Sequence, residues 1–312
     1  MGQAGVRLTR CLIRQSNCVW SALVLDKIRN FSRLKIQALI SLLYNIHIPN
    51  FFKGKIYTGK TKKICLPGLN CYSCPGAAGS CPIGSLQAVM GNRKFRFSYY
   101  VFGMMAFFGV MVGRLICGFL CPFGFFQDLL HKIPSPKFST KRLWPLRFVK
   151  YGILFSLIIA LGLVLRDVYE VIPPYFCKYI CPQGILQGAL PLAATNPKLR
   201  LGMGALFNWK LGILVITSLL AILYYRPFCK WICPLGAFYA FFNKYSFYQM
   251  EVSESKCIDC GKCERVCKMD VDIRKNACHH ECIRCNDCLK ACPTGAISTS
   301  LIKERKRYEK VQ

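Results

Sequence analysis

Residues 117–126 read CGFLCPFGFF, and residues 229–238 read CKWICPLGAF. Both stretches follow a long apolar run, and both contain the pattern C-x3-C-P-x-G. Side chains four positions apart lie on one face of a helix, so the two cysteines of each pair can point the same way. Proline disfavours helical backbone at the residue before it, which predicts that each helix ends at its second cysteine. The pattern therefore predicts two helix ends that each present two thiols.

The Cys-Pro unit belongs to a longer internal repeat. Cys-Pro-x-Gly occurs four times, and the first and third copies continue alike, as CPIGSLQ at 81–87 and CPQGILQ at 181–187. The second and fourth copies each follow an arginine, Arg114 or Arg226, that stands three positions before the first cysteine. Each half thus reads helix, Cys-Pro loop, helix, Cys-Pro loop, and repeats of this kind often build a site at their shared interface.

Two such helix ends, brought together by the repeat, would present four thiolates, which is the ligand set of a [4Fe-4S] cluster. The members of this predicted inner quartet are Cys117, Cys121, Cys229 and Cys233. Arg114 and Arg226 are predicted cofactor-binding residues that offset the negative charge of the cluster. The alternative role for these arginines is to anchor the helix ends at a membrane surface.

A second set of cysteines comes from the other two Cys-Pro loops. Residues 65–81 read CLPGLNCYSCPGAAGSC, and residues 177–181 read CKYIC. The candidate metal ligands of this outer set are Cys81, Cys177, Cys181 and one of Cys71 and Cys74. The sequence does not choose between those last two. A disulfide, which an oxidising compartment permits, is the alternative to a cluster here.

The C-terminal part has the cysteine pattern of a two-cluster ferredoxin. Residues 257–267 read CIDCGKCERVC, and residues 282–293 read CIRCNDCLKACP. In such a pair, three cysteines of each run bind one cubane and the fourth binds the other. Cluster one should use Cys257, Cys260, Cys263 and Cys292, and cluster two should use Cys282, Cys285, Cys288 and Cys267. Structural zinc is the alternative, although zinc sites usually need only paired C-x2-C units.

The composition is typical of a membrane protein that binds metal. The chain has 312 residues, of which 53% are hydrophobic, with 21 cysteines and a formal net charge of +29. The basic residues flank apolar segments, which argues against a nucleic-acid-binding protein. The tight grouping of the cysteines favours metal sites over a disulfide framework. The apolar runs that suggest membrane spans are 36–52, 99–116, 149–165 and 206–225, and the last three approach the ~20 residues that a bilayer demands.

The distribution of Lys and Arg predicts a topology. If all four runs span, the side with both termini and the inner Cys-Pro loops carries 29 Lys and Arg, against 11 on the other side. The positive-inside rule then places both termini in the cytoplasm.

At these motifs the chain resembles the membrane-bound polyferredoxins of the NapH type. The resemblance covers roughly residues 36–300 and rests on CGFLCP, CKWICP and the two ferredoxin runs. That family includes the quinol-oxidising accessory subunit of periplasmic nitrate reductase, the membrane regulator of nitrous oxide reductase and a copper-reducing accessory protein of cytochrome oxidase assembly. The resemblance implies four helices, cytoplasmic termini and electron transfer by iron–sulfur clusters. The outer stretch CYSCPGAAGSCP departs from the better-known members.

We therefore predict a mainly α protein. A polytopic four-helix membrane domain, built as an internal repeat, should be followed by a small α+β ferredoxin domain that holds two [4Fe-4S] clusters. The expected parts are a basic cytoplasmic segment (1–35), the membrane domain with Cys-Pro motifs on both faces (36–245), the cytoplasmic ferredoxin domain (250–300) and a basic tail (301–312).

The predicted function is electron transfer in a bacterial-type cytoplasmic membrane, from a cytoplasmic donor protein to a quinone or an extracytoplasmic acceptor. One or two further [4Fe-4S] clusters in the membrane domain would divide a hydrocarbon core that is ~30 Å thick. The expected partners are lipid and redox proteins, and whether the chain is a carrier or an oxidoreductase subunit stays open. Two alternatives remain: a quinol dehydrogenase subunit of a reductase complex, and a thiol–disulfide or copper-reducing relay in which the C-x3-C pairs cycle between dithiol and disulfide.

Overall fold

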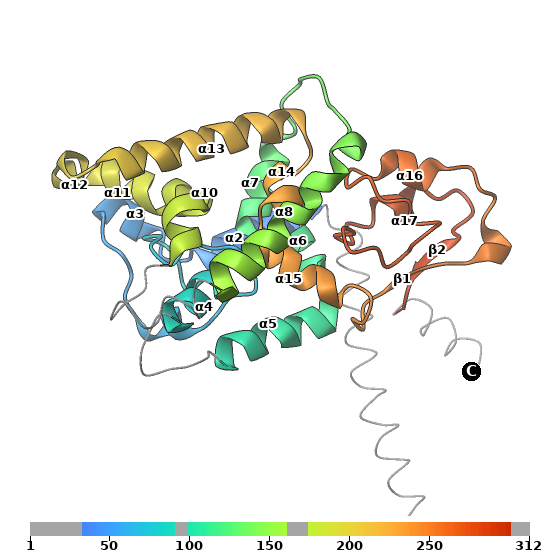
Figure 1. Ribbon diagram of the computed structural model, residues 1–312, viewed down its shortest axis with the longest axis horizontal. Coiled ribbons are helices and arrows are strands. Elements are labelled where there is room, and N and C mark those ends of the chain that lie inside the picture. The colour runs from blue at the N-terminus through green and yellow to red at the C-terminus, as the bar shows by residue number, and fades with distance from the viewer. Residues whose placement is uncertain (1–32, 91–98, 161–173, 301–312) are drawn as a thin grey trace, which may run out of the picture.

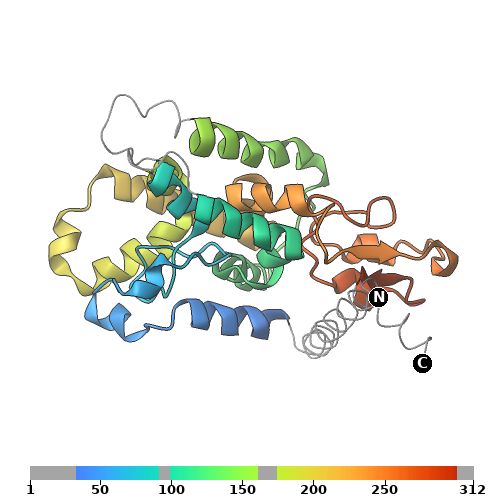
Figure 2. The same ribbon diagram turned by 90° about the horizontal axis from the view of Figure 1, so that it is seen from below.

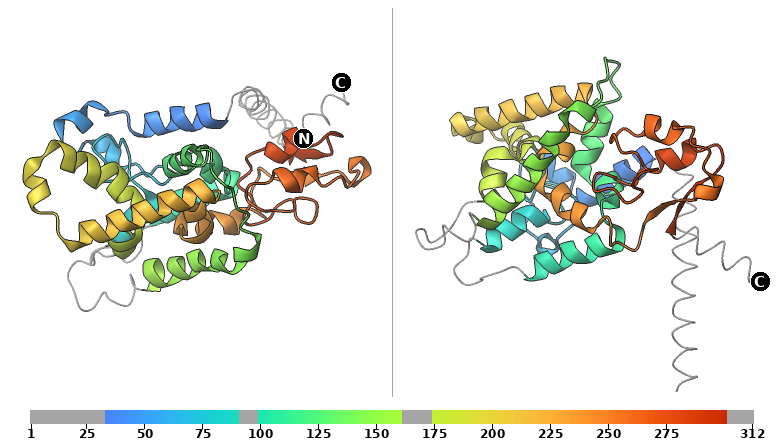
Figure 3. Two further views of the ribbon diagram at one scale, coloured as in Figure 1. Left: turned by 90° about the horizontal axis from the view of Figure 1, so that it is seen from above. Right: turned by 45° about the vertical axis from the view of Figure 1, so that its right-hand side comes forward.

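The computed structural model describes residues 33–90, 99–160 and 174–300. It is mainly helical, with a helical body and a small C-terminal domain (Figure 1). The C-terminal domain lies at the end of the body opposite the short helices that precede α13 (Figure 2, Figure 3). Almost all of the predicted basic N-terminal segment and the whole predicted basic tail lie outside the described residues.

The helical body consists of two series of short elements. The first series is α2 (Arg33–Tyr44), α3 (Pro49–Lys53), the 3-10 helix η1 (Lys60–Lys63), α4 (Pro82–Met90), α5 (Tyr99–Val112), α6 (Leu115–Phe119) and α7 (Pro122–Leu130). The second series is η2 (Lys141–Phe148), α8 (Val149–Ile153), η3 (Leu154–Ala160), η5 (Phe176–Ile180), α10 (Pro182–Gly184), η6 (Ile185–Ala189), α11 (Leu190–Thr195), α12 (Pro197–Leu201), α13 (Ala205–Leu223), α14 (Pro227–Trp231) and α15 (Pro234–Phe242).

The helices are interrupted at the Cys-Pro units, as the sequence predicts. Cys121, Cys181 and Cys233 have extended backbone, with ψ angles of 114°, 113° and 111°, and the proline that follows each one opens the next helix. Proline suits that first position because the helix needs no N–H there and its φ is already helical. The two inner steps match in length, since five-residue α6 and α14 precede nine-residue α7 and α15. Each cysteine therefore stands between two short helices.

The helix lengths correct the prediction of four full spans. In the part of the chain that the structure describes, one helix, α13, is long and apolar enough to cross a bilayer. Its 19 residues extend about 28 Å. The run 99–116 is interrupted because Gly113 adopts a left-handed φ of +54°, so α5 ends at Val112. The run 36–52 forms two helices, α2 and α3, rather than one, and the run 149–165 is described only as far as residue 160.

Core packing holds the cysteine-bearing elements together. Ile83 of α4, Ile116 of α6, Phe123 of α7 and Leu235 of α15 are almost completely buried in one cluster. The Phe123 ring meets Phe228 edge-on, with 5.0 Å between the ring centroids. Each such side chain contributes about 1.5–3 kcal/mol of burial free energy. The core of the body therefore lies around the Cys-Pro units.

The C-terminal domain is closed by a two-stranded sheet. Strand β1 (Met250–Val252) pairs antiparallel with β2 (Ile297–Thr299), so that Met250 lies opposite Thr299. Between the strands stand the 3-10 helix η7 (Glu254–Lys256) and the helices α16 (Lys262–Val266) and α17 (Asp287–Ala291). The sheet joins the two ends of the segment that carries both ferredoxin runs.

Candidate iron–sulfur centres

The cysteines predicted to bind cluster one line a single cavity in the C-terminal domain. The four lining cysteines are Cys257, Cys260, Cys263 and Cys292. Gly261 and Asn286, which precede α16 and α17, have φ of +68° and +64°. These left-handed residues turn the chain sharply between cysteines, so that thiols from both runs converge. Cys260 is exposed to solvent. This cavity therefore lies at the surface of the domain.

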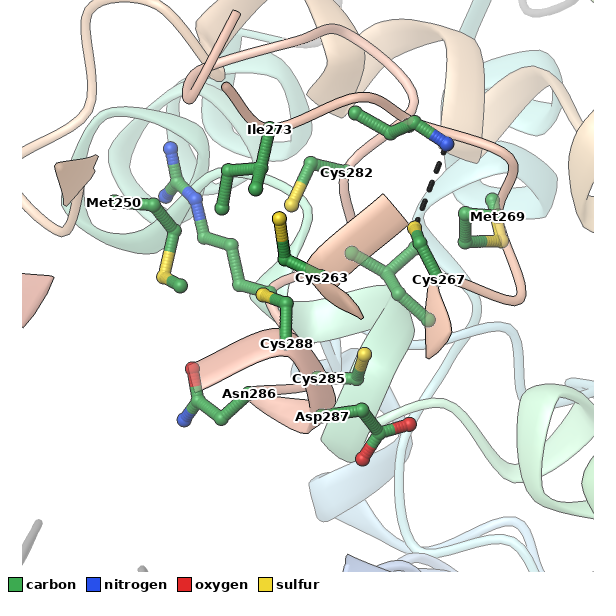
Figure 4. A pocket seen from close by; sticks show the side chains of 13 residues that line it. Met250, Cys263, Cys267, Met269, Ile273, Cys282, Cys285, Asn286, Asp287 and Cys288 are labelled. Atoms are coloured by element: carbon green, nitrogen blue, oxygen red, sulfur yellow. Dashed lines mark hydrogen bonds between the residues drawn. The ribbon is translucent and has the colours of Figure 1, made fainter. Parts of the chain in front are cut away.

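A second cavity collects the cysteines predicted to bind cluster two. Its lining includes Cys267, Cys282, Cys285 and Cys288, with Cys263 of the first run beside them (Figure 4). The Val271 backbone N–H donates to Cys267 Sγ at 3.4 Å. Burial raises the pKa of the Cys285 thiol to about 12. A thiol in this setting becomes a thiolate when a metal replaces its proton, as iron in a cluster would. The cavity therefore fits the predicted cofactor.

The four cysteines of the inner quartet meet in the core of the body. The Cys233 thiol is close enough to the thiols of Cys117, Cys121 and Cys229 to interact with them electrostatically. All four are only 5–7% exposed. Burial, together with the neighbouring Cys229 and Cys117, raises the pKa of the Cys121 thiol to about 12. The structure thus brings together two pairs that are 112 positions apart in the sequence.

The side chains of Arg114 and Arg226 each extend from their own half of the body into the other half. Both guanidinium groups are fully buried. Arg114 Nη2 donates to the Cys229 carbonyl oxygen at 3.4 Å, and Arg226 Nη1 donates to the Cys117 carbonyl oxygen. Each arginine therefore binds the backbone of a cysteine in the opposite half and carries positive charge to the quartet.

Glycine leaves room for these crossings. A Cβ on Gly124 would lie 3.1 Å from the Cys117 carbonyl oxygen and 3.2 Å from Nη1 of Arg226. A Cβ on Gly236 would lie 3.4 Å from the Cys229 carbonyl oxygen and 3.5 Å from the Arg114 guanidinium. The glycine of each inner Cys-Pro-x-Gly unit is therefore packed against the arginine of the other half.

Each buried arginine is paired with a carboxylate from a different part of the chain. Asp128 of α7 accepts from Arg226 Nε at 2.7 Å and from Nη2 at 2.6 Å. Burial alone would raise the pKa of Asp128, but the charges of Arg226 and Arg33 lower it to about 2. Arg114 instead donates to Glu281 of the C-terminal domain at 2.7 Å. The second carboxylate is therefore supplied by the ferredoxin part of the chain.

The outer quartet also converges, and it contains Cys71. Cys177 lies within electrostatic range of Cys181, Cys81 and Cys71, and Cys181 lies within range of Cys71. The Cys74 thiol instead donates to Asn45 Oδ1 at 3.3 Å and is fully buried. The structure thus groups Cys71, rather than Cys74, with the other three cysteines.

A lysine accompanies the outer quartet. Lys210 Nζ donates to the Cys177 carbonyl oxygen at 3.1 Å. A Cβ on Gly184 would lie 3.1 Å from Lys210 Nζ and 3.9 Å from Cys71 Sγ. The outer quartet therefore also has a positive charge beside its thiols, carried here by α13.

Two glutamines donate to cysteine sulfur, which the sequence analysis missed. Gln127 Nε2 donates to Cys229 Sγ at 3.1 Å, and Gln87 Nε2 donates to Cys177 Sγ at 3.7 Å. Each glutamine stands six positions after a Cys-Pro cysteine, and each reaches a sulfur of the opposite half. The recurrence of C-P-x-G-x-x-Q was the available signal. Gln187, in the same position of the third unit, accepts from the Cys71 backbone N–H instead.

One short loop joins the two quartets of the body. Within residues 65–71, the backbone of Leu69 lies beside the Cys121 thiol, and a Cβ on Gly68 would lie 3.2 Å from the Cys121 Cα. The Leu69 carbonyl oxygen accepts from Gln183 Nε2 at 3.3 Å, and Gln183 is two residues after the outer ligand candidate Cys181. Leu69 therefore lies beside a cysteine of the inner quartet and accepts a hydrogen bond from the segment that follows Cys181.

The cluster-two loop is docked on the inner quartet. A Cβ on Gly118 would lie 2.5 Å from the Ile283 carbonyl oxygen, so the two backbones are in direct contact. Arg284 Nη1 donates to the Val112 carbonyl oxygen at 2.8 Å, and its Nη2 donates to the Asn243 carbonyl oxygen at 2.7 Å. Asn243 Nδ2 in turn donates to the Cys282 carbonyl oxygen at 2.8 Å. The loop between two candidate ligands of cluster two thus rests on the loop between Cys117 and Cys121.

The described cysteines are free thiols. Within residues 33–90, 99–160 and 174–300, no group of three or more His, Cys, Asp and Glu side chains has the arrangement that holds a single metal ion. Thiolates that each bind a different iron of a cubane stand further apart than the ligands of one ion. The donor set, all sulfur and grouped in fours, fits clusters.

Comparisons with known proteins identify two matching domain models, both described as 4Fe-4S binding domains. One matches residues 99–141, 153–192 and 208–249, and the other matches residues 280–298. The matched segments include the inner quartet and the whole second ferredoxin run, residues 282–293. No solved structure matches the chain.

Several curated relatives share this region. The uncharacterized protein MJ0750 of Methanocaldococcus jannaschii is 30% identical over 61% of this chain and 74% of its own length. The regulatory protein NosR of Pseudomonas aeruginosa is 25% identical over 63% of this chain and 26% of its own length. The methylamine utilization ferredoxin-type protein MauN of Paracoccus denitrificans is 25% identical over 52% of this chain and 50% of its own length.

The narrower resemblance to NapH-type proteins stays a prediction. The wider relationship rests on the 4Fe-4S domain models and on the extent of the match to MJ0750. The chain belongs to the ferredoxin-type family of 4Fe-4S proteins that includes MJ0750, NosR and MauN.

Proposed function

We propose that this protein is a membrane-embedded electron carrier with four [4Fe-4S] clusters. Two clusters would occupy the C-terminal cavities, and one each would occupy the inner and outer quartets. Each bound cluster would supply a centre that accepts and releases one electron. The observation that carries the proposal is the contact between Gly118 and the Ile283 carbonyl oxygen, which joins the ligand loops of two different sites.

Contacts between neighbouring candidate sites support a row of four clusters. Cys263, a candidate ligand of cluster one, also lines the cavity of cluster two. The cluster-two loop contacts the α6 backbone at Gly118, and Leu69 lies between Cys121 of the inner quartet and Gln183, which follows Cys181 of the outer quartet. An electron would therefore cross the ~30 Å of a hydrocarbon core in several short steps rather than one.

The polar groups around the inner quartet would hold a charged cluster in a buried place. A cluster with four thiolate ligands is an anion, and burying an anion without compensation is costly. Arg114 and Arg226 supply the opposite charge at the carbonyl groups of Cys229 and Cys117. Gln127 adds a hydrogen bond to Cys229 Sγ. We assign these three side chains the role of stabilising and positioning the inner cluster.

The outward-facing side chains of the body support a membrane location. Only 17% of the apolar window of α13 is buried inside the protein. Exposed apolar area on this scale is unfavourable in water and is usual where lipid covers a protein. The exposed apolar side chains include Leu39, Leu42 and Leu43 of α2, Phe107 and Met111 of α5, Phe155 of η3, and Val215, Ile216 and Leu219 of α13.

The docking of the C-terminal domain supports the proposed orientation. The domain sits on the inner quartet, so both belong on one side. If the four apolar segments together cross the membrane, that side carries 29 Lys and Arg against 11, which favours the cytoplasm. A matched pair of variants tests this. In cells, a membrane-impermeant thiol reagent should label Tyr72→Cys directly but Tyr245→Cys only after permeabilisation. Both tyrosines are exposed, at 55% and 72%. The reverse pattern would overturn the orientation.

The iron content tests the number of clusters. Protein purified without oxygen should contain about 16 Fe and about 16 acid-labile sulfide per chain, because four cubanes each hold four of both. A content of about 8 Fe would limit the clusters to the C-terminal domain. The body cysteines would then be dithiols, and the thiol–disulfide relay would replace the proposal.

A further inference from the structure

The cluster-one cavity faces away from the helical body. The cluster-two loop contacts the body through Ile283 and Arg284, whereas cluster one opens to solvent beside the exposed Cys260. Ile258, which lines the cluster-one cavity, is 64% exposed. Under the proposed function, this is the end of the row that a water-soluble redox protein can reach.

The surface around that cavity is basic. Lys256, Lys262 and Arg265 are all exposed, and Lys262 lines the cavity itself. Arg265 Nη2 also donates to the Cys260 carbonyl oxygen at 2.9 Å, which holds its positive charge beside a candidate ligand. This surface therefore combines three exposed cations with one exposed apolar side chain, Ile258.

Two nearby carboxylates, Glu264 and Asp259, are already paired with other cations, whereas Glu254 of η7 is exposed close to Lys256 in the chain. Glu264 accepts from Lys141 Nζ at 2.7 Å and from Arg274 Nη2 at 3.1 Å. Asp259 lies 3.4 Å from Arg274 Nη1. Across the described part of the chain, the ion pairs that reach this surface involve Lys141 and Arg274, and none involves the three exposed cations of this surface. Their charge is left for another molecule.

We propose that this surface, which we call the distal face and define by Lys256, Ile258, Lys262 and Arg265, docks an acidic soluble protein that carries one electron. The inference rests on the proposed function. A small apolar centre with a charged rim suits a brief encounter, because the rim charges steer the partner and the centre excludes water. One electron passes from the reduced partner to the oxidised protein, and no bond or proton changes place.

The test is the rate at which an acidic plant-type [2Fe-2S] ferredoxin reduces the full-length protein in lipid nanodiscs. At low salt, the double variant Lys262→Glu/Arg265→Glu should be reduced about tenfold or more slowly than the wild type. The wild-type rate should fall steeply as the ionic strength rises, because salt screens the attraction. Lys198→Glu is the matched control, since Lys198 is exposed on α12 at the other end of the body. It should be reduced at the wild-type rate.

Reduced methyl viologen separates docking from cluster loss. It is a small reductant that needs no protein interface, so it should reduce the wild type and all variants equally fast. Equal slowing by Lys198→Glu, or a wild-type rate that does not depend on salt, would overturn the docking proposal while leaving the clusters intact. Charge-dependent binding of the distal face to phosphatidylglycerol vesicles, with unchanged ferredoxin kinetics, would assign the face to lipid and overturn it too. A low iron content with no viologen reduction would instead disprove the electron-carrier function itself.

Discussion

The C-terminal domain and the helical body assemble cysteine quartets in opposite ways. The domain takes all eight ligand candidates from residues 257–292, and its cluster-one cavity opens toward solvent beside the exposed Cys260. The body joins cysteines from its two halves, about 100 residues apart in the sequence, and the four inner ones are only 5–7% exposed. A site built from neighbouring residues can lie at a surface and meet partners. A site built across two halves depends on the whole fold, and each half completes the other.

The largest expected effect comes from removing one body ligand. Cys233→Ser should lower the iron content by about 4 Fe per chain, because a cubane needs its four ligands, while the spectra of the C-terminal clusters stay unchanged. Cys74→Ser is the matched control, because the Cys74 thiol donates a hydrogen bond to Asn45 and lies outside the outer quartet. Iron analysis of protein prepared without oxygen gives the answer. Equal iron in Cys233→Ser and wild type would show that the inner quartet holds no cluster.

The second prediction concerns the ion pair that spans the two halves. Arg226→Met removes one of the two arginines that pair with the buried Asp128 and leaves Arg33 in place, so it should destabilise the protein by about 1.5–3 kcal/mol, the usual cost of losing a hydrogen bond to a charged group. The exposed pair of Lys141 with Glu264 is the comparison, and Lys141→Met should change stability little or not at all. Thermal unfolding, followed by loss of cluster absorbance, measures both. If the two variants had similar melting temperatures, the buried ion pair between the two halves would contribute no more to stability than the exposed pair.

The third prediction uses pH to probe the junction between the regions. Burial would raise the pKa of Glu281, but Arg114 and Lys150 lower it to about 2. A lowered pKa means that the charged carboxylate stabilises the docked state at neutral pH. That contribution is complete above the unfolded pKa of about 4.3 and is lost as the pH falls to about 2.

Hydrogen exchange of residues 279–285 can measure this contribution. At pH 7, Glu281→Gln should exchange about tenfold faster or more than the wild type, because the amide cannot neutralise two buried cations. The difference should shrink as the pH is lowered toward 2. Glu251→Gln is a control at a half-buried carboxylate on β1, outside the junction. A difference that grows in acid would contradict the assigned direction of the pKa shift.

The smallest expected effect is electronic. Gln127→Leu removes the hydrogen bond to Cys229 Sγ, which stabilises the more negative, reduced cluster. The midpoint potential of the inner cluster should fall by roughly tens of millivolts, since about 1 kcal/mol per electron corresponds to that range. Gln187→Leu is the control, because the Gln187 side chain accepts a hydrogen bond from the Cys71 backbone N–H instead of donating one to sulfur. Redox titration followed by electron paramagnetic resonance compares them, and equal shifts would refute the role of the N–H···S bond.

Local spacing explains which features were predictable from the sequence. The ferredoxin quartets depend on turns within a short segment, and the helix breaks at Cys121 and Cys233 depend on the proline that follows. The pairing of Arg114 with Glu281 joins residues 167 positions apart, and no periodicity encodes it. The choice of Cys71 over Cys74 depends on a hydrogen bond to Asn45.

The apolar composition of the predicted membrane spans led to an overestimate of the length of the helices. The run 99–116 is apolar throughout, but one left-handed glycine at 113 ends α5 four residues before the predicted end. That glycine packs against Asn243 and Arg284, so the break lets the chain receive the C-terminal domain. Apolar composition alone carries no information about such a contact.

The spread of the ligands along the chain also sets the order in which the sites become complete during synthesis. The outer quartet has all its cysteines once residue 181 has been added, and the inner quartet once residue 233 has been added. Cluster two must wait for residue 288 and cluster one for residue 292. We therefore expect the buried centres to be loaded before the one at the surface. An unfinished chain would then hold no solvent-exposed cluster through which electrons escape to oxygen.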